Sequence, residues 1–331
     1  MTQVRRAAIL GAGGWGTSIA RLLADNGFET RLWARDSAFA DTLERERQNS
    51  VYLPGAMFPE NIRACSDMAL VLSGAEVVVS AVPSHGLRAV LEVARPFIGK
   101  EAILVSATKG IEAVSLLTPT GIIRDVLGNQ GIVALSGPSF AKEVSQGLPA
   151  AVCAASSSLE AAQAVQSAFS TRAFRVYTNA DVIGVELGGA LKNVMAIASG
   201  ISDGLSLGLN ARAALITRGL AEMTRLGVKM GAQAATFSGL SGLGDLVLTC
   251  TGALSRNYST GVALGKGKTI EEAQHDRQVS EGVKTAEAAW SLAEKRGVET
   301  PIINEVYAVL YEGKRPKDAC LELMTRGLKA E

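Results

Sequence analysis

Short apolar runs alternate with longer amphipathic segments over the first half of the chain. The apolar runs lie at 7–10, 30–33, 77–82, 103–106, 132–135 and 150–154, and a last strand pattern covers 174–177. Between them, segments such as 17–24 and 87–93 carry apolar residues at the spacing of a helix. Strands that alternate with helices are typical of βαβ units, so we predict a doubly wound parallel sheet.

Strand patterns fade after residue 177, and long helical patterns take their place. The helical patterns cover 182–199, 211–226, 285–296 and 302–311. The length of 331 residues suits two domains, at roughly 100 to 200 residues each. We therefore predict a doubly wound α/β domain over 1–180 and an all-α domain over 181–331.

Charge and hydropathy narrow the classes of partner. Lys and Arg number 33 against 32 Asp and Glu, which gives a net charge of +1. This balance provides no general attraction to a polyanion, so nucleic acid is not an expected partner. No uninterrupted apolar run of about 18 residues occurs, which disfavours a membrane-spanning helix.

The few cysteines and histidines leave little material for several kinds of site. The four cysteines are far apart and form no C-x-x-C pair, which fits a reducing compartment. His85 and His275 are too few for a histidine metal cage or a Ser-His-Asp triad. We expect a cytoplasmic protein without a resident metal.

A glycine-rich segment follows the first predicted strand and precedes a helical pattern. Residues 11–16 read G-A-G-G-W-G, which matches the G-x-G-x-x-G fingerprint of dinucleotide-binding proteins. Without side chains, backbone N–H groups and the helix N-terminus can approach a pyrophosphate. We predict a dinucleotide cofactor here, with an ordinary glycine turn as the alternative. The fingerprint residues are Gly11, Gly13, Gly14, Trp15 and Gly16.

Two charged residues follow the second predicted strand, where the adenosine ribose is expected. Arg35 can bind a 2′-phosphate, whereas Asp36 can accept from a free 2′-hydroxyl if its side chain points inward. The pair favours NADPH as the cofactor and leaves NADH as the alternative. Two solvated loop charges are the simpler interpretation.

Polar residues also follow the next predicted strands. Ser84, Lys109 and the G-P-S-F turn at 137–140 each come after an apolar run. Ligands of open α/β sheets bind beyond the carboxyl ends of the strands, so we expect these residues to face one crevice. An ordinary surface lysine is the alternative for Lys109.

Lys192 stands alone in an otherwise uncharged helical pattern. It is the only charged residue between Glu186 and Asp203, and its neighbours are small or apolar. Such a helix has no polar face and is expected to be buried. Desolvation lowers the pKa of a buried amine, which suits proton exchange near neutral pH. We predict a proton-transfer group, with a lysine that extends along the helix to solvent as the alternative.

Two further polar groups follow in the helical half. Residues 238–245 form a glycine-rich turn that ends at Asp245, whose carboxylate can orient Lys192 and pair with its charge. Residues 255–257, Ser-Arg-Asn, combine hydroxyl, guanidinium and amide groups that suit the oxygens of a phosphate. A solvated polar loop would have the same composition.

Together these segments resemble the NAD(P)-dependent sn-glycerol-3-phosphate dehydrogenases in their soluble bacterial form, over nearly the whole chain. The blocks that carry the resemblance are G-A-G-G-W-G-T at 11–17, A-T-K-G at 107–110, S-G-P-S-F-A at 136–141, L-G-G-A-L-K-N-V at 187–194, G-L-G-D-L at 242–246 and S-R-N at 255–257. The resemblance implies reduction of dihydroxyacetone phosphate to sn-glycerol 3-phosphate, the backbone of phospholipids. It also implies a Rossmann-like domain followed by a helical domain, with the site between them.

The resemblance implies roles for individual residues as well. It makes Lys192 the proton donor and acceptor at the carbonyl oxygen, with Asp245 holding the lysine and Lys109 polarising the carbonyl. The family's substrate-binding positions match Lys109, Gly137, Ser139, Lys192, Asp245, Ser255, Arg256 and Asn257. Its cofactor-binding positions match Gly14, Trp15, Arg35, Lys109, Ala141, Arg256, Val279 and Glu281, with Tyr52 a weaker match.

Two other functions share part of this pattern. A related hydroxy-acid dehydrogenase or keto-acid reductase would have both domains and a lysine–asparagine pair, but would bind a carboxylate in place of a phosphate. Residues 255–257 alone do not decide between these ligands. A nucleotide-sensing protein without activity would need the fingerprint but not Lys192 together with Asp245. The small and apolar residues of the helical half favour a homodimer, with no interface indicated.

Overall fold

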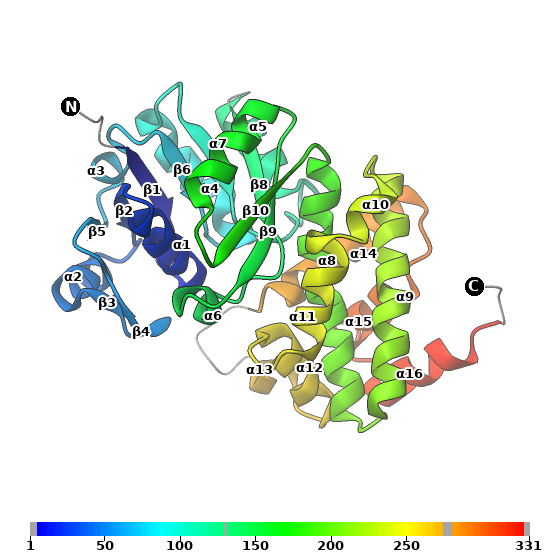
Figure 1. The fold of residues 1–331 in the computed structure, drawn as a ribbon. Helices are drawn as coiled ribbons and strands as arrows, with labels where there is room; N and C mark the ends of the chain where they lie inside the picture. The colour runs from blue at the N-terminus through cyan, green and yellow to red at the C-terminus, as the bar shows by residue number, and fades with distance from the viewer. Residues whose placement is uncertain (1–4, 129–130, 274–279, 328–331) are drawn as a thin grey trace. The chain divides into compact units, whose positions relative to one another are not determined.

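The computed structural model describes residues 5–128, 131–273 and 280–327, which divide into two compact units. The first unit lies within 1–109 and 117–182, and the second within 110–116 and 183–331. The first is a sheet with helices on both faces, and the second is helical (Figure 1). The segment 110–116 belongs to the second unit by its packing, and its Ile111 side chain lies in that unit's core.

Eight strands form the sheet of the first unit. They are β1 Arg6–Leu10, β2 Glu29–Trp33, β5 Ile62–Cys65, β6 Val77–Ser80, β7 Ile103–Ser106, β8 Ile132–Ser136, β9 Ala150–Ala155 and β10 Phe174–Asn179. The order across the sheet is β10-β9-β8-β7-β6-β1-β2-β5. From β5 to β8 the neighbours pair in parallel, in the strand order of a doubly wound dinucleotide-binding fold. The connections change direction between β1 and β6, which is where such folds bind their ligands.

Helices cover both faces of this sheet. They are α1 Gly14–Asp25, α2 Ser37–Glu46, α3 Met68–Leu72, α4 Leu87–Ala94, α5 Pro119–Leu127, α6 Ala141–Ser145 and α7 Leu159–Phe169. Within β1, Ala7 and Ile9 join a buried cluster with α1, α2 and α7, whereas Ala8 and Leu10 join one with α3, α4 and α5. Both faces are therefore apolar, which explains why the strands read as continuous apolar runs.

One pairing differs from the predicted parallel sheet. β9 runs antiparallel to β8, with Ala134 opposite Ala155, so the sheet is mixed. A parallel return usually crosses over one face of the sheet through a helix that spans it. The connection from β8 to β9 contains only α6, of 5 residues, and the chain turns back beside β8.

Three short strands have no counterpart among the predicted elements. The edge strand β5 has 4 residues, and its side chains alternate between buried and exposed or half-buried positions. Strands β3 Gln48–Asn49 and β4 Leu53–Met57 form a separate antiparallel hairpin. Each contains too few apolar residues to produce a recognisable periodic pattern.

The second unit is built around a long buried helix. Its helices are α8 Val182–Gly204, α9 Gly208–Lys229, α10 Ala234–Phe237, α11 Asp245–Thr251, α12 Arg256–Gly265, α13 Ile270–Ala273, α14 Glu281–Arg296, α15 Pro301–Tyr311 and α16 Pro316–Thr325, with a π-helix at Leu240–Gly244. Among its described residues no strand occurs. By length and composition α8 passes as a membrane span, but 89% of that window is buried inside the protein. Its burial identifies it as a core helix.

Candidate active site

The glycine-rich segment turns from the end of β1 into α1. The helix begins at Gly14, and its N-cap Gly13 offers no side chain to the first N–H groups. A Cβ at Gly16 would lie 1.9 Å from Gly11 O, so the turn is too tight for a side chain there. At Gly13, in contrast, a Cβ would meet nothing within 4 Å. The open helix N-terminus fits the pyrophosphate of a dinucleotide.

Two further residues predicted to bind the cofactor, Tyr52 and Ala141, lie beside this loop. Tyr52 O lies 2.9 Å, and the Ala141 Cβ 3.8 Å, from the position that a Cβ would take at Gly14. Ser18, in the first half of α1, donates its hydroxyl to Ala141 O at 3.0 Å. The indole nitrogen of Trp15 is buried and has no hydrogen-bond partner among the described residues, so this ring acts by packing. Tyr52 and Ala141 thus lie beside the fingerprint although they are distant in sequence.

Arg35 and Asp36 follow β2, and both are exposed. Asp36 Oδ1 accepts from Phe39 N at 2.7 Å and caps α2. The carboxylate is held at the end of this helix, so the inward orientation considered for binding a ribose hydroxyl is not the one that the structure shows. Within the described part of the chain, no hydrogen bond or ion pair involves Arg35. The guanidinium is the better placed of the two for a ligand.

Lys109, Gly137 and Ser139 come together at the carboxyl ends of β7 and β8. Lys109 Nζ donates to Gly137 O at 3.2 Å, and Ser139 Oγ donates to the same carbonyl at 3.0 Å. Ser84 differs, because it is 1% exposed and lies in the 3-10 turn Ser84–Gly86 after β6. Its hydroxyl is enclosed by protein, which does not agree with the predicted position facing a crevice.

Lys192 lies in the middle of α8, and its side chain is 8% exposed. Nζ donates to Asp245 Oδ1 at 2.8 Å and to Thr249 Oγ1 at 2.7 Å. The lysine therefore does not extend to solvent, and it forms the ion pair with Asp245 that its sequence context indicates. A buried ion pair adds little net stability, because desolvation offsets the attraction between the charges. The presence of this ion pair in an apolar helix core therefore indicates a catalytic role for Lys192.

Thr249 completes the surroundings of this lysine, and the sequence analysis does not single it out. Asp245 and Thr249 lie one turn apart on one face of α11. The Thr249 hydroxyl donates to Asp245 O at 2.6 Å, so its oxygen accepts from Lys192. The spacing of four residues after the predicted Asp245 is the sequence signal that would have found it.

Close backbone packing brings these groups together. Residues 240–244 form a π-helix that leads directly into α11, in place of the predicted loop turn. A Cβ at Gly188 of α8 would lie 2.4 Å from Ser241 O. The absence of a side chain at Gly188 therefore allows the π-helix to lie against α8 and sets the position of Asp245.

The amide of Asn257 is fixed at the start of α12. Asn257 Oδ1 accepts from Ser280 Oγ at 2.6 Å and from Gly282 N at 2.9 Å. Both bonds use the amide oxygen, so they determine the direction of the donor nitrogen. α12 packs directly on α8, because a Cβ at Gly200 would lie 2.1 Å from Tyr258 O, and one at Gly261 would lie 2.1 Å from Ile197 O.

The remaining predicted site residues of the second unit lie at helix starts. Ser255 Oγ accepts from Tyr258 N at 3.2 Å and caps α12. Arg256 is the first residue of α12 and is exposed, and Glu281 is the first residue of α14. Val279 lies outside the described residues.

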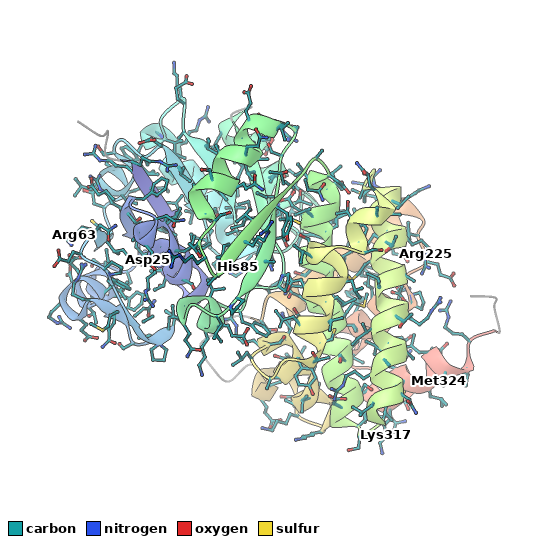
Figure 2. All side chains as sticks on the ribbon, viewed as in Figure 1. Asp25, Arg63, His85, Arg225, Lys317 and Met324 are labelled. Atoms are coloured by element: carbon teal, nitrogen blue, oxygen red, sulfur yellow. The ribbon has the colours of Figure 1, made fainter. Side chains whose placement is uncertain are left out.

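The chain offers little to metal or thiol chemistry where the structure describes it. No group of three His, Cys, Asp or Glu side chains able to hold a metal occurs among the described residues. His85 lies in the 3-10 turn after β6 (Figure 2), and His275 is outside the described residues. Burial raises the pKa of the Cys250 thiol to about 12, so this residue stays protonated and is a poor nucleophile.

Known proteins match both halves of the chain. The family described as NAD-dependent glycerol-3-phosphate dehydrogenase matches with its N-terminus over 6–162 and its C-terminus over 181–321. The chain is 55% identical to glycerol-3-phosphate dehydrogenase (NAD(P)+) of Citrifermentans bemidjiense and 53% identical to that of a Geobacter species. Each alignment spans 328 residues and covers 98% of both chains. The crystal structure of glycerol-3-phosphate dehydrogenase from Coxiella burnetii is similar with a TM-score of 0.95 and 42% identity, covering 98% of this chain and 99% of that one.

Proposed function

Because the chain belongs to the NAD-dependent glycerol-3-phosphate dehydrogenase family, we propose that it reduces dihydroxyacetone phosphate to sn-glycerol 3-phosphate with NAD(P)H. A bound nicotinamide supplies the hydride for the ketone carbon. The product provides the backbone for phospholipid synthesis. The observation that carries this proposal is the buried lysine of α8, which is held by a carboxylate and a hydroxyl in an otherwise apolar core.

Proton transfer is the role that we assign to Lys192. As the ketone is reduced, its oxygen develops negative charge and takes up a proton. Asp245 and Thr249 hold the Lys192 nitrogen at a fixed place, from which an ammonium can donate a proton. A preorganised donor needs no reorganisation at the moment of reaction. In the reverse direction the amine accepts the proton.

The start of α12 is the proposed phosphate anchor. Arg256 supplies a guanidinium there, and Asn257 supplies an amide whose oxygen is already bonded to α14 and its N-cap. Charge-assisted hydrogen bonds to phosphate oxygens are strong, and the helix N-terminus adds to them. Binding energy from the phosphate positions the carbonyl for reaction. In the first unit, Lys109 with Gly137 and Ser139 is the corresponding candidate for substrate contact.

NADPH is the proposed preferred cofactor. Arg35 is exposed at the end of β2, whereas the Asp36 carboxylate is engaged at the N-terminus of α2. A guanidinium suits a 2′-phosphate, and a carboxylate suits a free 2′-hydroxyl. We further propose a cytoplasmic location, which agrees with four cysteines that are free thiols. A homodimer remains a prediction that size-exclusion chromatography with light scattering will test.

The deciding experiment follows NADPH oxidation by the purified protein with four ketones. We expect rapid oxidation with dihydroxyacetone phosphate and very little with unphosphorylated dihydroxyacetone, because the anchor needs a phosphate. Equal kcat/KM for these two ketones would exclude the phosphate anchor. Pyruvate and ketopantoate test the alternative keto-acid reductase, which a higher kcat/KM for either acid would establish.

A further inference from the structure

We propose that Asn49 is a positioning residue for the cofactor. Its carboxamide, carried by the β3–β4 hairpin, holds the glycine-rich loop so that the loop's backbone N–H groups face the pyrophosphate. The inference rests on the proposed function, because it takes this loop as the cofactor site. Asn49 belongs neither to the main sheet nor to the fingerprint, and no sequence pattern singles it out.

Every polar atom of the Asn49 side chain is engaged. Nδ2 donates to Ala12 O at 2.9 Å and to Thr17 Oγ1 at 2.8 Å. Oδ1 accepts from Tyr52 N at 3.0 Å, and the residue is 0% exposed. One side chain therefore joins the loop, the first turns of α1 and the hairpin, and its complete burial keeps it from contacting a ligand itself.

The bond to Ala12 matters because of the charge that a carbonyl carries. Ala12 lies inside the fingerprint, and its oxygen would repel a pyrophosphate if it faced one. Asn49 holds this oxygen toward the hairpin, while the next residue, Gly13, caps the open end of α1. Thr17 N donates to Gly13 O at 2.9 Å, so the second bond of Asn49, to the Thr17 hydroxyl, fixes the same turn.

The hairpin supports the loop at a second point. Tyr52 O lies only 2.9 Å from the position that a Cβ would take at Gly14, the first residue of α1. The hairpin backbone and the loop backbone therefore approach each other directly at Gly14, while Asn49 bridges them at Ala12. Two contacts on neighbouring peptides fix the orientation of the loop as well as its position.

Asn49→Asp tests the proposal with little change of shape. The substitution replaces the donor nitrogen by an acceptor oxygen, so Ala12 O faces a carboxylate and Thr17 Oγ1 loses its donor. The probe is NADPH, titrated into the purified full chain and followed by fluorescence. We expect the Kd for NADPH to rise by about tenfold or more, since buried polar groups are left unpaired. The KM for dihydroxyacetone phosphate at saturating NADPH should change little.

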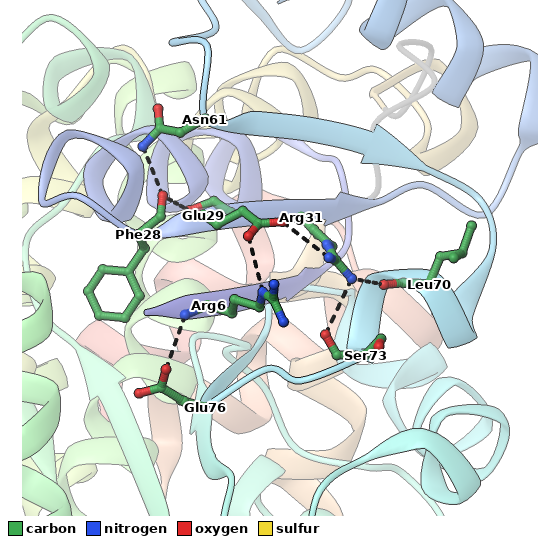
Figure 3. Close-up of polar contacts among 9 residues, drawn as sticks. Arg6, Phe28, Glu29, Arg31, Asn61, Leu70, Ser73 and Glu76 are labelled. Carbon is green, nitrogen blue, oxygen red and sulfur yellow. Dashed lines mark hydrogen bonds and ion pairs between the residues drawn. The ribbon is translucent and has the colours of Figure 1, made fainter. Parts of the chain in front are cut away.

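Asn61→Asp is the matched control. Asn61 Nδ2 also donates to two backbone carbonyls of the first unit, Ala24 O at 2.8 Å and Phe28 O at 2.8 Å. Figure 3 shows the second of these bonds. These carbonyls lie outside the glycine-rich loop, so this variant should lose thermal stability and keep its NADPH affinity. A structural role alone would lower the Tm in both variants and leave both Kd values near that of the wild type. Equal Kd values for the two variants would overturn the proposal.

Thr17→Val keeps the test decisive if Asn49→Asp does not fold. Valine has the shape of threonine and removes only the acceptor of the second Asn49 bond. We expect a several-fold rise in the NADPH Kd, on the order of one lost hydrogen bond, and an unchanged Kd would overturn the proposal. A wild-type protein that binds neither NADPH nor NADH would contradict the proposed function. Tight binding by the wild type and by the variants would contradict only the role of Asn49.

Discussion

The two units carry their candidate chemistry in opposite ways. In the first unit the glycine-rich loop works through absent side chains, which leave a tight turn and an open helix N-terminus. In the second unit Lys192, Asp245 and Thr249 are polar side chains enclosed in a helical core. We therefore expect cofactor binding at the glycine-rich loop to be impaired by added side-chain atoms. Catalysis at Lys192 should instead be impaired by the removal of side-chain atoms.

Lys192→Ala should give the largest effect and separate the two sites. The proton donor is lost, and general acid–base groups contribute about 10² to 10⁴ in rate, so kcat should fall by that factor. The Kd for NADPH should stay within about threefold of the wild-type value, because the loop is untouched. Stopped-flow kinetics and NADPH titration measure the two quantities on the folded variant, confirmed by circular dichroism. A variant that keeps more than about a tenth of kcat would transfer the role to Lys109.

Glu222 is a second buried carboxylate of the helical core, and it accepts from backbone N–H groups where Asp245 has a lysine. Its carboxylate accepts from Ile302 N at 2.7 Å and from Ile303 N at 3.3 Å, at the start of α15. Burial raises the pKa of Glu222 to about 7, against the lowering effect of these N–H groups. The pKa of Glu222 is higher in the folded than in the unfolded protein. Its protonation therefore contributes fully to the free energy of unfolding below about pH 4.5, and this contribution is lost as the pH rises through 7.

The expected size is about 3 kcal/mol in the free energy of unfolding across this pH range. Glu222→Gln keeps an acceptor oxygen and cannot titrate, so that part of the pH dependence should disappear. Urea unfolding of wild type and variant near pH 5 and pH 8 provides the comparison. The same pH dependence in both proteins would show that Glu222 does not titrate in this range.

Arg35→Ser returns to the first unit and tests a side chain at the edge of the backbone site. Hydrogen bonds to charged groups are worth about 1.5 to 3 kcal/mol, so kcat/KM for NADPH should fall by about ten- to a hundredfold. NADH has only a hydroxyl at this position and should lose much less. The measurement is the ratio of kcat/KM for the two cofactors. An unchanged ratio would place the choice of cofactor on other residues.

Thr249→Val should give the smallest effect, because Asp245 still holds the lysine. We expect kcat to fall by about tenfold or less, with NADPH affinity unchanged, as one hydrogen bond to Lys192 is lost. Thr251→Val is the control, because Thr251 Oγ1 on the same helix donates to Val247 O and is exposed. Equal kcat for the two variants would remove Thr249 from the proposed site.

The sequence predicts those features that depend on local pattern. The apolar runs identify β1, β6 and β7, and the lone charge in an apolar helix identifies Lys192. The direction of β9 is wrong in the prediction, because a strand pattern contains no information on direction. The orientation of Asp36 stays open in the sequence, because a ribose and a helix end both suit its carboxylate.

Partners that are distant in sequence explain the residues that the prediction misses. Asn49 matters through Ala12 and Thr17, and its own surroundings contain only a two-residue strand. Thr249 matters through Lys192, which is on another helix. The spacing of four residues after Asp245 is the only sequence signal for Thr249, and without the fold the sequence gives no reason to select Asn49 from among the other asparagines.

The glycines between α8 and α12 have a consequence for substrate length. Because backbone lies on backbone at Gly200 and Gly261, no rotamer change can alter the spacing of the two helices. Helix α8 carries the proposed proton donor and α12 the proposed phosphate anchor. Main-chain contacts therefore set the distance between these two groups. We therefore expect a ketose phosphate whose carbonyl and phosphate are one carbon further apart to fit these two groups less well than dihydroxyacetone phosphate. Discrimination between ketose phosphates of different carbon-chain length would then persist when the side chains around the two helices are substituted.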